Sequence, residues 1–184
     1  MIGGEALQQI KQVLESGGII AYPTEAVWGL GCDPWCEAAV LRLLKLKQRS
    51  TDKGLILVAA AFEQLDFLLH DLPLVGLQRM QAGRSEFCTW LVPHKNRVPL
   101  WISGAHDTVA VRVSRHDIVQ SLCQTCGVLV STSANLAGQE PARTQRQVEH
   151  YFPVGLQFIV AGQVQTNLNP SSIYDAMSGA LIRA

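Results

Sequence analysis

Apolar residues along this chain follow two spacings, one typical of amphipathic helices and one typical of buried strands. Residues 6–15 have helical spacing, with Leu7, Ile10 and Leu14 on one face, and the glycine pair that follows is a common end signal. The same spacing predicts further helices over 37–47, 63–69, 117–125 and 145–151. Short apolar runs predict strands over 18–22, 54–60, 89–93, 108–113, 128–131, 158–160 and 180–183.

Helical and strand patterns interleave along the whole chain, which predicts an α/β fold with a largely buried sheet. No internal repeat, low-complexity tract or linker interrupts them, so we expect residues 1–184 to form a single domain. A chain of 184 residues buries roughly 70% of its unfolded surface, so its stability requires neither a disulfide nor a metal. The order of the strands does not follow from the pattern.

Composition narrows the classes of protein to which the chain can belong. Apolar residues make up 48% of the chain and charged residues 16%, below the ~25% of an average soluble protein, which excludes a disordered chain. Fifteen Lys and Arg balance fifteen Asp and Glu, so net charge gives no reason to expect nucleic-acid binding. The first residues do not resemble a signal peptide, and no apolar run approaches the ~18 residues of a membrane span. We therefore expect a cytoplasmic protein with no membrane partner.

The cysteines have two interpretations. Their odd number without a secretory leader indicates reduced thiols. Cys123-Gln-Thr-Cys126 is a C-x-x-C pair, which is typical of half a zinc site or of a redox pair. Cys32 and Cys36 have a wider spacing, and the C-x-x-C pair falls inside an apolar helical pattern where small buried cysteines are ordinary. We therefore favour the interpretation that Cys123 and Cys126 are ordinary core cysteines over a zinc site or redox pair, and no metal site is expected.

Basic residues gather between Arg42 and Lys53, five of them against the single acid Asp52. Such a cluster is typical of a solvated helix face or of a phosphate site. Lys47 and Arg49 fall at the end of a predicted helix, where cations are favoured by the helix dipole in any case. The cluster immediately precedes an apolar strand, and Arg and Lys together can hold a polyphosphate.

Three other polar segments accompany predicted strands, where open α/β sheets bind ligands. The segment 22–26 follows the first strand and precedes two glycines, a pattern that alone indicates a tight turn. Thr108 and Arg112 share one face of a strand, which suits a carboxylate or phosphate, although an edge-strand Arg facing water fits equally well. The hydroxyl-rich segment 131–135 follows an apolar strand. It fits either a turn whose hydroxyls hydrogen-bond to its own backbone or a nest of N–H groups that binds an anion.

The histidines give no metal or triad spacing, and the chain has no Walker A sequence. Taken together and in this order, however, the polar segments closely resemble those of the YrdC/TsaC family of threonylcarbamoyl-adenylate synthases. The matching stretches are 21–31 (AYPTEAVWGLG), 46–49 (LKQR), 52–56 (DKGLI), 109–112 (VAVR), 131–135 (STSAN) and 169–173 (NPSSI). The combination is specific and covers nearly the whole chain.

The resemblance implies a twisted mixed sheet flanked by helices, with a concave basic cavity. It implies an enzyme that joins L-threonine, bicarbonate and ATP into threonylcarbamoyl-AMP and releases pyrophosphate. Partner proteins then transfer the threonylcarbamoyl group to an adenosine beside the anticodon of tRNA. Such an enzyme would work through positioning and charge stabilisation, with Mg²⁺ on the phosphates.

The resemblance also implies roles for single residues. On the ATP side it implies Lys47, Arg49, Lys53, Thr108, Ser133, Asn135 and Arg183, with Lys47 and Arg49 as the catalytic cations. On the threonine side it implies Thr24, Arg112, Ser131 and Ser172. Because the substrates are all anions, a site rich in cations and hydroxyl or amide donors fits them chemically.

Three positions depart from the family pattern. Ala26 stands where many relatives have Thr, and Val58 stands where they have His. Residues 84–87, Arg-Ser-Glu-Phe, stand where the family usually has Trp-Pro-Gly-Pro. Loss of that rigid turn leaves a second hypothesis open, an RNA-binding or ribosome-maturation module that uses a basic concavity without catalysis.

Overall fold

A computed structural model describes residues 2–83, 87–165 and 171–183. Its α-helices are α1 Gly4–Glu15, α2 Glu37–Lys47, α3 Asp66–Leu69, α4 Leu74–Ala82, α5 Leu100–Ser103, α6 Asp117–Cys126 and α7 Gln145–Tyr151, with short 3₁₀ turns η1 Thr51–Lys53 and η2 Phe62–Leu65. Local sequence explains several helix ends. Thr144 and Gln147 form a reciprocal capping box at the start of α7, and Gln48, with a φ of 54°, ends α2 in the left-handed conformation.

Within the described residues the strands form one mixed sheet in the order β7-β1-β2-β6-β3-β5-β4-β8-β9. Their bounds are β1 Ile20–Pro23, β2 Trp28–Gly31, β3 Ile56–Ala59, β4 Cys88–Pro93, β5 Thr108–Val113, β6 Leu129–Ser133, β7 Phe158–Ile159, β8 Ser172–Asp175 and β9 Leu181–Arg183. The pairs β1–β7, β3–β5 and β4–β8 are parallel, and the other neighbours are antiparallel. The α/β class with a mixed sheet is therefore confirmed.

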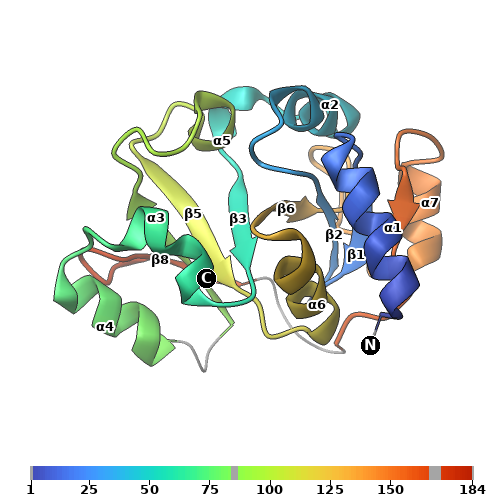
Figure 1. The fold of residues 1–184 in the computed structure, drawn as a ribbon. Helices are drawn as coiled ribbons and strands as arrows, with labels where there is room; N and C mark the ends of the chain where they lie inside the picture. Colours follow the sequence, from blue (N-terminus) through green and yellow to red (C-terminus); the bar gives the residue numbers. More distant parts are fainter. Residues whose placement is uncertain (1, 84–86, 166–170, 184) are drawn as a thin grey trace.

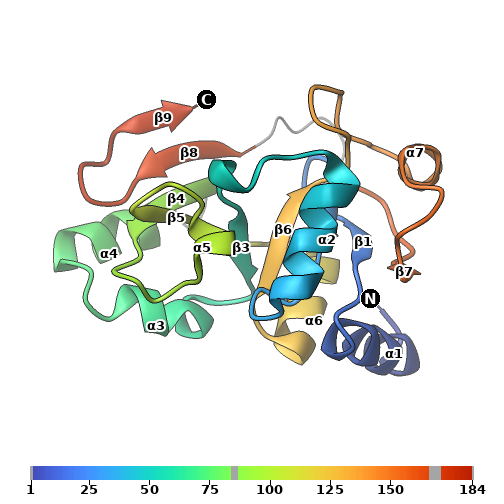
Figure 2. The same ribbon diagram turned by 90° about the horizontal axis from the view of Figure 1, so that it is seen from above.

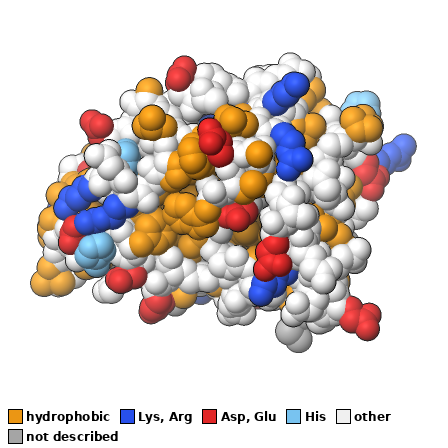
Figure 3. All heavy atoms as spheres, turned by 45° about the horizontal axis from the view of Figure 1, so that its top comes forward, with side chains coloured by type: hydrophobic (Ala, Val, Ile, Leu, Met, Phe, Trp, Pro, Cys, Tyr) orange, Lys and Arg blue, Asp and Glu red, His pale blue; other side chains and the backbone are white. Residues whose placement is uncertain are grey.

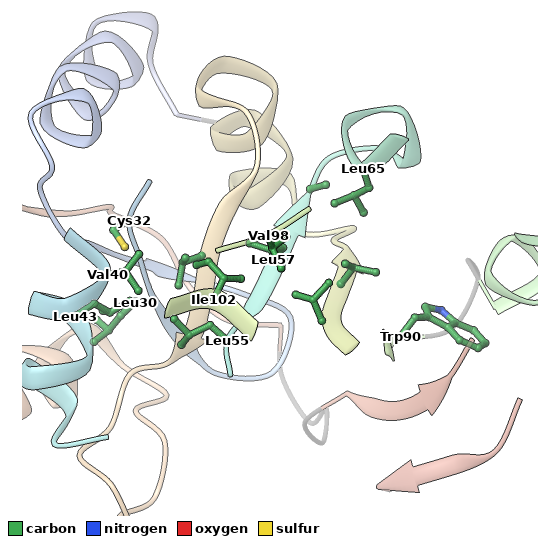
Figure 4. Close-up of a cluster of buried hydrophobic side chains, with 14 of the residues drawn as sticks. Leu30, Cys32, Val40, Leu43, Leu55, Leu57, Leu65, Trp90, Val98 and Ile102 are labelled. Carbon is green, nitrogen blue, oxygen red and sulfur yellow. The ribbon is translucent and has the colours of Figure 1, made fainter. Parts of the chain in front are cut away.

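Helices cover the sheet in groups (Figures 1 and 2). The helices α1 and α6 pack on each other and on β1, whereas α2 and α5 contact each other elsewhere on the sheet. Two clusters of buried side chains result. The larger joins α2 and the strands β2 and β3 through residues such as Leu30, Leu43 and Leu57, which lie close together in Figure 4. The smaller lies under α1 and α6. This packing holds the central strands rigid where their polar side chains emerge.

Most elements predicted from the sequence are present, and the main differences are elements for which there was no prediction. No strand was predicted over β2, where two glycines follow the tight turn expected at 22–26. Its Gly31 packs so closely on β6 that an added Cβ would lie 2.6 Å from the carbonyl oxygen of Val130. Glycine in β2 therefore serves a close strand approach rather than a turn. The nine-residue helix α4 was also missed, and the four-residue elements α5 and β8 have patterns too brief to predict. The expected change of turn at 84–86 lies outside the described residues.

Candidate functional site

A cavity of about 450 Å³ opens along the strands of the central sheet. Eight residues expected at the site line it: Thr24, Arg49, Lys53, Thr108, Arg112, Ser131, Ser133 and Arg183. They are contributed by segments spread from residue 24 to residue 183, which only the folded sheet brings together.

Strand register explains why the polar residues of different strands meet. Ile56 of β3 pairs with Ser131 of β6 on one side and with Ala110 of β5 on the other, and all three line the cavity. Residues in register point to the same face of a sheet. The expected shared face of Thr108, Ala110 and Arg112 is therefore confirmed by the cavity lining. The segment 131–133 is strand rather than turn, and the turn begins after Ser133.

Arg112 carries the main buried cation of the cavity. Arg112 is 8% exposed, and its Nε is buried without a hydrogen-bond partner. Its guanidinium carbon lies 5.0 Å from the centre of the Phe87 ring. Stacking on a ring leaves the in-plane N–H groups of a guanidinium available. Arg112 is therefore arranged to receive an anion from the cavity.

A buried carboxylate, Glu25, balances the charge of Arg112. Its Oε1 accepts hydrogen bonds from the Ser114 hydroxyl at 2.7 Å and from the Arg115 backbone N–H at 2.9 Å. Burial alone would raise the pKa of Glu25, but the charge of Arg112 and these two hydrogen bonds hold it below the ordinary glutamate value. Glu25 consequently stays ionised and favours the charged guanidinium. Sequence reasoning assigned it no role, because the pairing depends on contacts across about 90 residues of chain.

Lys47 lies behind the cavity wall rather than in its lining. It is 3% exposed, and its Nζ donates to the backbone oxygens of Ser133 and Asn135, the latter at 2.8 Å, and to Asn135 Oδ1 at 3.3 Å. Its own carbonyl accepts from the Ala137 N–H at 3.0 Å. Burial, and then the charge of Arg49, lower the pKa of Lys47 to about 7, while the oxygens around its Nζ favour the ammonium. The residue ties the end of α2 to the turn after β6.

Asn135 holds that turn from within. Its Oδ1 accepts from the Ser133 hydroxyl at 2.6 Å, and its Nδ2 donates to the carbonyls of Leu136 at 3.1 Å and Gln139 at 2.7 Å. Its amide group is therefore occupied by the protein. Asn135 was expected on the ATP side, but it shapes the turn and does not line the cavity.

Arg49 and Lys53 face the cavity from the segment that follows α2. Arg49 donates to the carbonyl of Gly54 at 2.9 Å, and its Nε is buried without a partner. Burial lowers the pKa of Arg49, which remains a cation because its ordinary value is so high. Lys53 is exposed at the cavity mouth. The two cations therefore offer an anion one buried contact and one solvated contact.

The serine that lines the cavity at the start of β8 is not the one that was expected. Ser171, not Ser172, lines the cavity; it is 4% exposed and its hydroxyl lies 2.8 Å from that of Thr89. Arg183 reaches its backbone carbonyl at 3.4 Å. Sequence reasoning missed Ser171, and it also missed Ser103, His106 and Phe87, which border the same cavity. The start of β8 decides which serine points inward, and its pattern is too short to predict.

The cysteine pair lies on α6, with Cys123 buried in the core and Cys126 partly buried. The Cys123 thiol donates to the carbonyl of Val58 at 3.5 Å, and burial raises its pKa to about 12. Within the described residues no disulfide joins any of the five cysteines. Across residues 2–83, 87–165 and 171–183, no group of three or more His, Cys, Asp or Glu is placed to hold a metal ion. The helices of the same described part are all too short or too polar to cross a bilayer.

Comparisons of sequence and of structure both relate the chain to one protein family. A family model designated Sua5_yciO_yrdC, described as telomere recombination, matches residues 12–184. A threonylcarbamoyl-AMP synthase of Stutzerimonas stutzeri is 54% identical over 183 residues, which cover 100% of this chain and 99% of that protein. A threonylcarbamoyl-AMP synthase of Pseudomonas aeruginosa is also 54% identical, with the same coverage.

Two solved structures are similar in fold. The crystal structure of P. abyssi Sua5 complexed with L-threonine superposes with a TM-score of 0.86 at 28% identity, over 95% of this chain and 52% of that one. The chain thus spans about half the length of that protein. E. coli YciO superposes with a TM-score of 0.87 at 20% identity, over 100% of this chain and 90% of its own.

Proposed function

Because the chain belongs to the Sua5/YciO/YrdC family, we propose that it is a cytoplasmic threonylcarbamoyl-AMP synthase, a single-domain YrdC-like nucleotidyltransferase. Its substrates would be L-threonine, bicarbonate and ATP, and its product would serve the threonylcarbamoyladenosine modification of tRNA. The observation that carries the proposal is one cavity with cations at two places along β3: Arg49 bonds to Gly54 just before the strand, next to Lys53, whereas Arg112 pairs with Val58 further along it.

The side formed by Arg49 and Lys53 suits the phosphates of ATP. A guanidinium with an unpartnered buried Nε gives a directional contact, and an exposed ammonium adds charge at the mouth. We assign the nucleotide contacts to these cations together with Thr108, Ser133 and Arg183, all in the lining. Lys47 and Asn135 would act on the same side by holding the turn that carries Ser133.

The side formed by Arg112 suits the carboxylate of threonine. A guanidinium can hold a carboxylate through two parallel N–H···O bonds, and the neighbouring Ser131 and Ser171 offer hydroxyl donors. The Thr24 hydroxyl already donates to the carbonyl of Val27 at 2.7 Å, so Thr24 would contribute an acceptor or its methyl group. Crystallised P. abyssi Sua5, which carries L-threonine, supports an amino-acid side in this fold.

The chemistry requires no nucleophilic side chain. The threonine amine attacks the carbon of bicarbonate and water leaves, giving a carbamate. The carbamate oxygen then attacks the α-phosphorus of ATP, and pyrophosphate leaves. Catalysis would come from holding three anions together and from cations that balance the charge on the departing pyrophosphate.

The residues present fit an Mg²⁺ ion that is coordinated by the nucleotide and not by the protein. The described cavity lining holds hydroxyls, amides and cations but no carboxylate, so the metal would be held by phosphate oxygens and would neutralise part of their charge.

A coupled assay of pyrophosphate release tests the proposal. The purified chain is incubated with ATP, bicarbonate and Mg²⁺, with and without L-threonine. We expect release that depends on threonine, together with a product of the mass of threonylcarbamoyl-AMP. Release at the same rate without threonine would refute the proposal. Arg49→Ala is expected to lose most of the activity, whereas Arg146→Ala, an exposed arginine of α7 outside the cavity lining, serves as the matched control.

The RNA-binding hypothesis fits the visible surface less well. On the face seen in Figure 3, hydrophobic side chains gather near the centre, and the Lys and Arg side chains are interspersed with Asp and Glu. Non-specific RNA binding depends on clustered cations and falls steeply with salt. A salt-dependent RNA complex formed by a protein that releases no pyrophosphate would favour the module over the enzyme.

A further inference from the structure

Phe87 occupies an unusual position at the threonine side of the cavity. It is half-buried, it lines the cavity, and its ring lies under the guanidinium of Arg112 at 5.0 Å. The resemblance to the YrdC/TsaC family places a proline at this position, where no such stacking can occur. The chain thus combines a shared arginine with an aromatic partner of its own.

The stack fixes how Arg112 can bind. A guanidinium whose face is covered by a ring keeps its N–H groups in the plane, and the ring also excludes water from that face. Because Arg112 Nε is buried without a protein partner, that plane still has an unused donor. The contact with Phe87 therefore orients Arg112 toward a planar, two-oxygen ligand.

Apolar side chains share the cavity with the hydroxyl groups. Besides Phe87, the cavity is bordered by Ala26, Leu91 and Ile173. Ala26 stands where the resemblance places a threonine, so one hydroxyl that the family pattern would supply is absent from this cavity. An amino acid whose carboxylate is held by Arg112 would then have hydrocarbon within reach of its side chain.

We propose that Phe87 is a specificity-determining residue, which orients Arg112 for the carboxylate of the amino acid and presents an apolar wall to the methyl group that distinguishes threonine from serine. This inference rests on the proposed function. One methyl group in an apolar pocket is worth roughly tenfold or more in discrimination. Two contributions are separable, because the ring's π face acts on Arg112 and its bulk acts on the substrate side chain.

Two substitutions in the full chain separate these contributions. Phe87→Leu keeps an apolar wall but removes the π face, so the KM values for threonine and serine should rise together by roughly threefold to tenfold, with their ratio kept. Phe87→Ala removes both, so the preference for threonine over serine in kcat/KM should also fall about tenfold. The KM for ATP should stay within about twofold of the wild type in both variants, because the ring lies away from the phosphate cations.

The controls distinguish the inference from its premise. Phe62→Leu alters a partly buried phenylalanine outside the cavity lining, and its kinetics should match the wild type. Circular dichroism and the unfolding midpoint establish that each variant is folded, and Phe87→Leu carries the test if Phe87→Ala is not. Threonine-independent release by the wild type would overturn the proposed function. Threonine-dependent release with unchanged threonine KM and unchanged selectivity in both variants would overturn the role of Phe87 alone.

Discussion

Replacing Lys47 with methionine should destabilise the protein and weaken ATP use through one physical cause. Methionine fills a similar volume without a charge, so packing is largely kept. What is lost is the ammonium that donates to the backbone oxygens of Ser133 and Asn135 and to Asn135 Oδ1. The Asn135 Oδ1 keeps the Ser133 hydroxyl as a donor, so two carbonyls lose a partner.

The size of the effect follows from the Asn135 carbonyl, because the Ser133 carbonyl still accepts from the Asn135 backbone N–H at 3.0 Å. Leaving one buried acceptor unpaired costs about 1–3 kcal/mol. Removing an ammonium that is only 3% exposed also removes its desolvation penalty, which opposes the loss. We expect a net decrease of about 0.5–2 kcal/mol in the free energy of unfolding, measured by urea denaturation of wild type and Lys47→Met.

The pH dependence of stability is a separate test of Lys47. Burial, and then Arg49, lower the pKa of Lys47 from 10.5 to about 7. Between those values the unfolded chain binds the lysine proton and the folded chain releases it, so this group makes folding more favourable as pH rises. The stability difference between wild type and Lys47→Met should therefore grow from about pH 7 to about pH 9, below the range in which both forms lose the proton.

Activity distinguishes a structural role from direct contact with ATP. If Lys47 holds the wall, Lys47→Met should raise the KM for ATP in step with its loss of stability. A variant of unchanged unfolding free energy that has lost all pyrophosphate release would refute this reasoning and would place the Lys47 ammonium on the phosphates.

Three further predictions concern the other charged and hydroxyl groups. Glu25→Gln should lower the free energy of unfolding by about 1.5–3 kcal/mol at neutral pH, since a charged acceptor is lost. In the wild type, the stability due to Glu25 should be present above the ordinary glutamate value of 4.5 and lost as pH falls through its lowered pKa, and acid titration followed by fluorescence should detect this loss only in the wild type. Arg49→Ala should raise the KM for ATP at least about tenfold with a smaller change for threonine, and equal changes in both would contradict its assignment to the phosphates. Ser171→Ala should reduce kcat/KM for threonine more than Ser172→Ala, because only Ser171 lines the cavity, and the reverse order in the same assay would contradict this placement.

The sequence predicted the elements whose patterns are long enough to have one interpretation. The helices α1, α2 and α6 and the strand β5 lie where apolar spacing placed them, because each buries one face against the sheet. The alternation within β5 even placed Arg112 on the face of the cavity. Strand β2 was missed because its glycines allow contact with β6, a reason that exists only in the folded sheet.

The site was predictable as a set of segments but not as a geometry. The family resemblance pointed to Thr24, Arg49 and Ser131, and all three line one cavity in the fold. Register decided the rest. A shift of one residue exchanges the two faces of a strand, so the choice between Ser171 and Ser172 could not be made from an apolar run of this length.

The basic cluster at the end of α2 shows that the burial of each cation, rather than its residue type, decides what it can do. Lys47 ends α2, and Arg49 and Lys53 follow within six residues, so residue type and spacing alone do not distinguish their depths. In the fold Lys47 is buried against backbone oxygens, Arg49 is half-buried at the cavity and Lys53 is exposed at its mouth. Screening by salt acts on exposed charges and much less on buried ones. The three cations therefore form a graded arrangement, in which the innermost holds the wall, the middle one binds with direction, and the outermost attracts anions from solution.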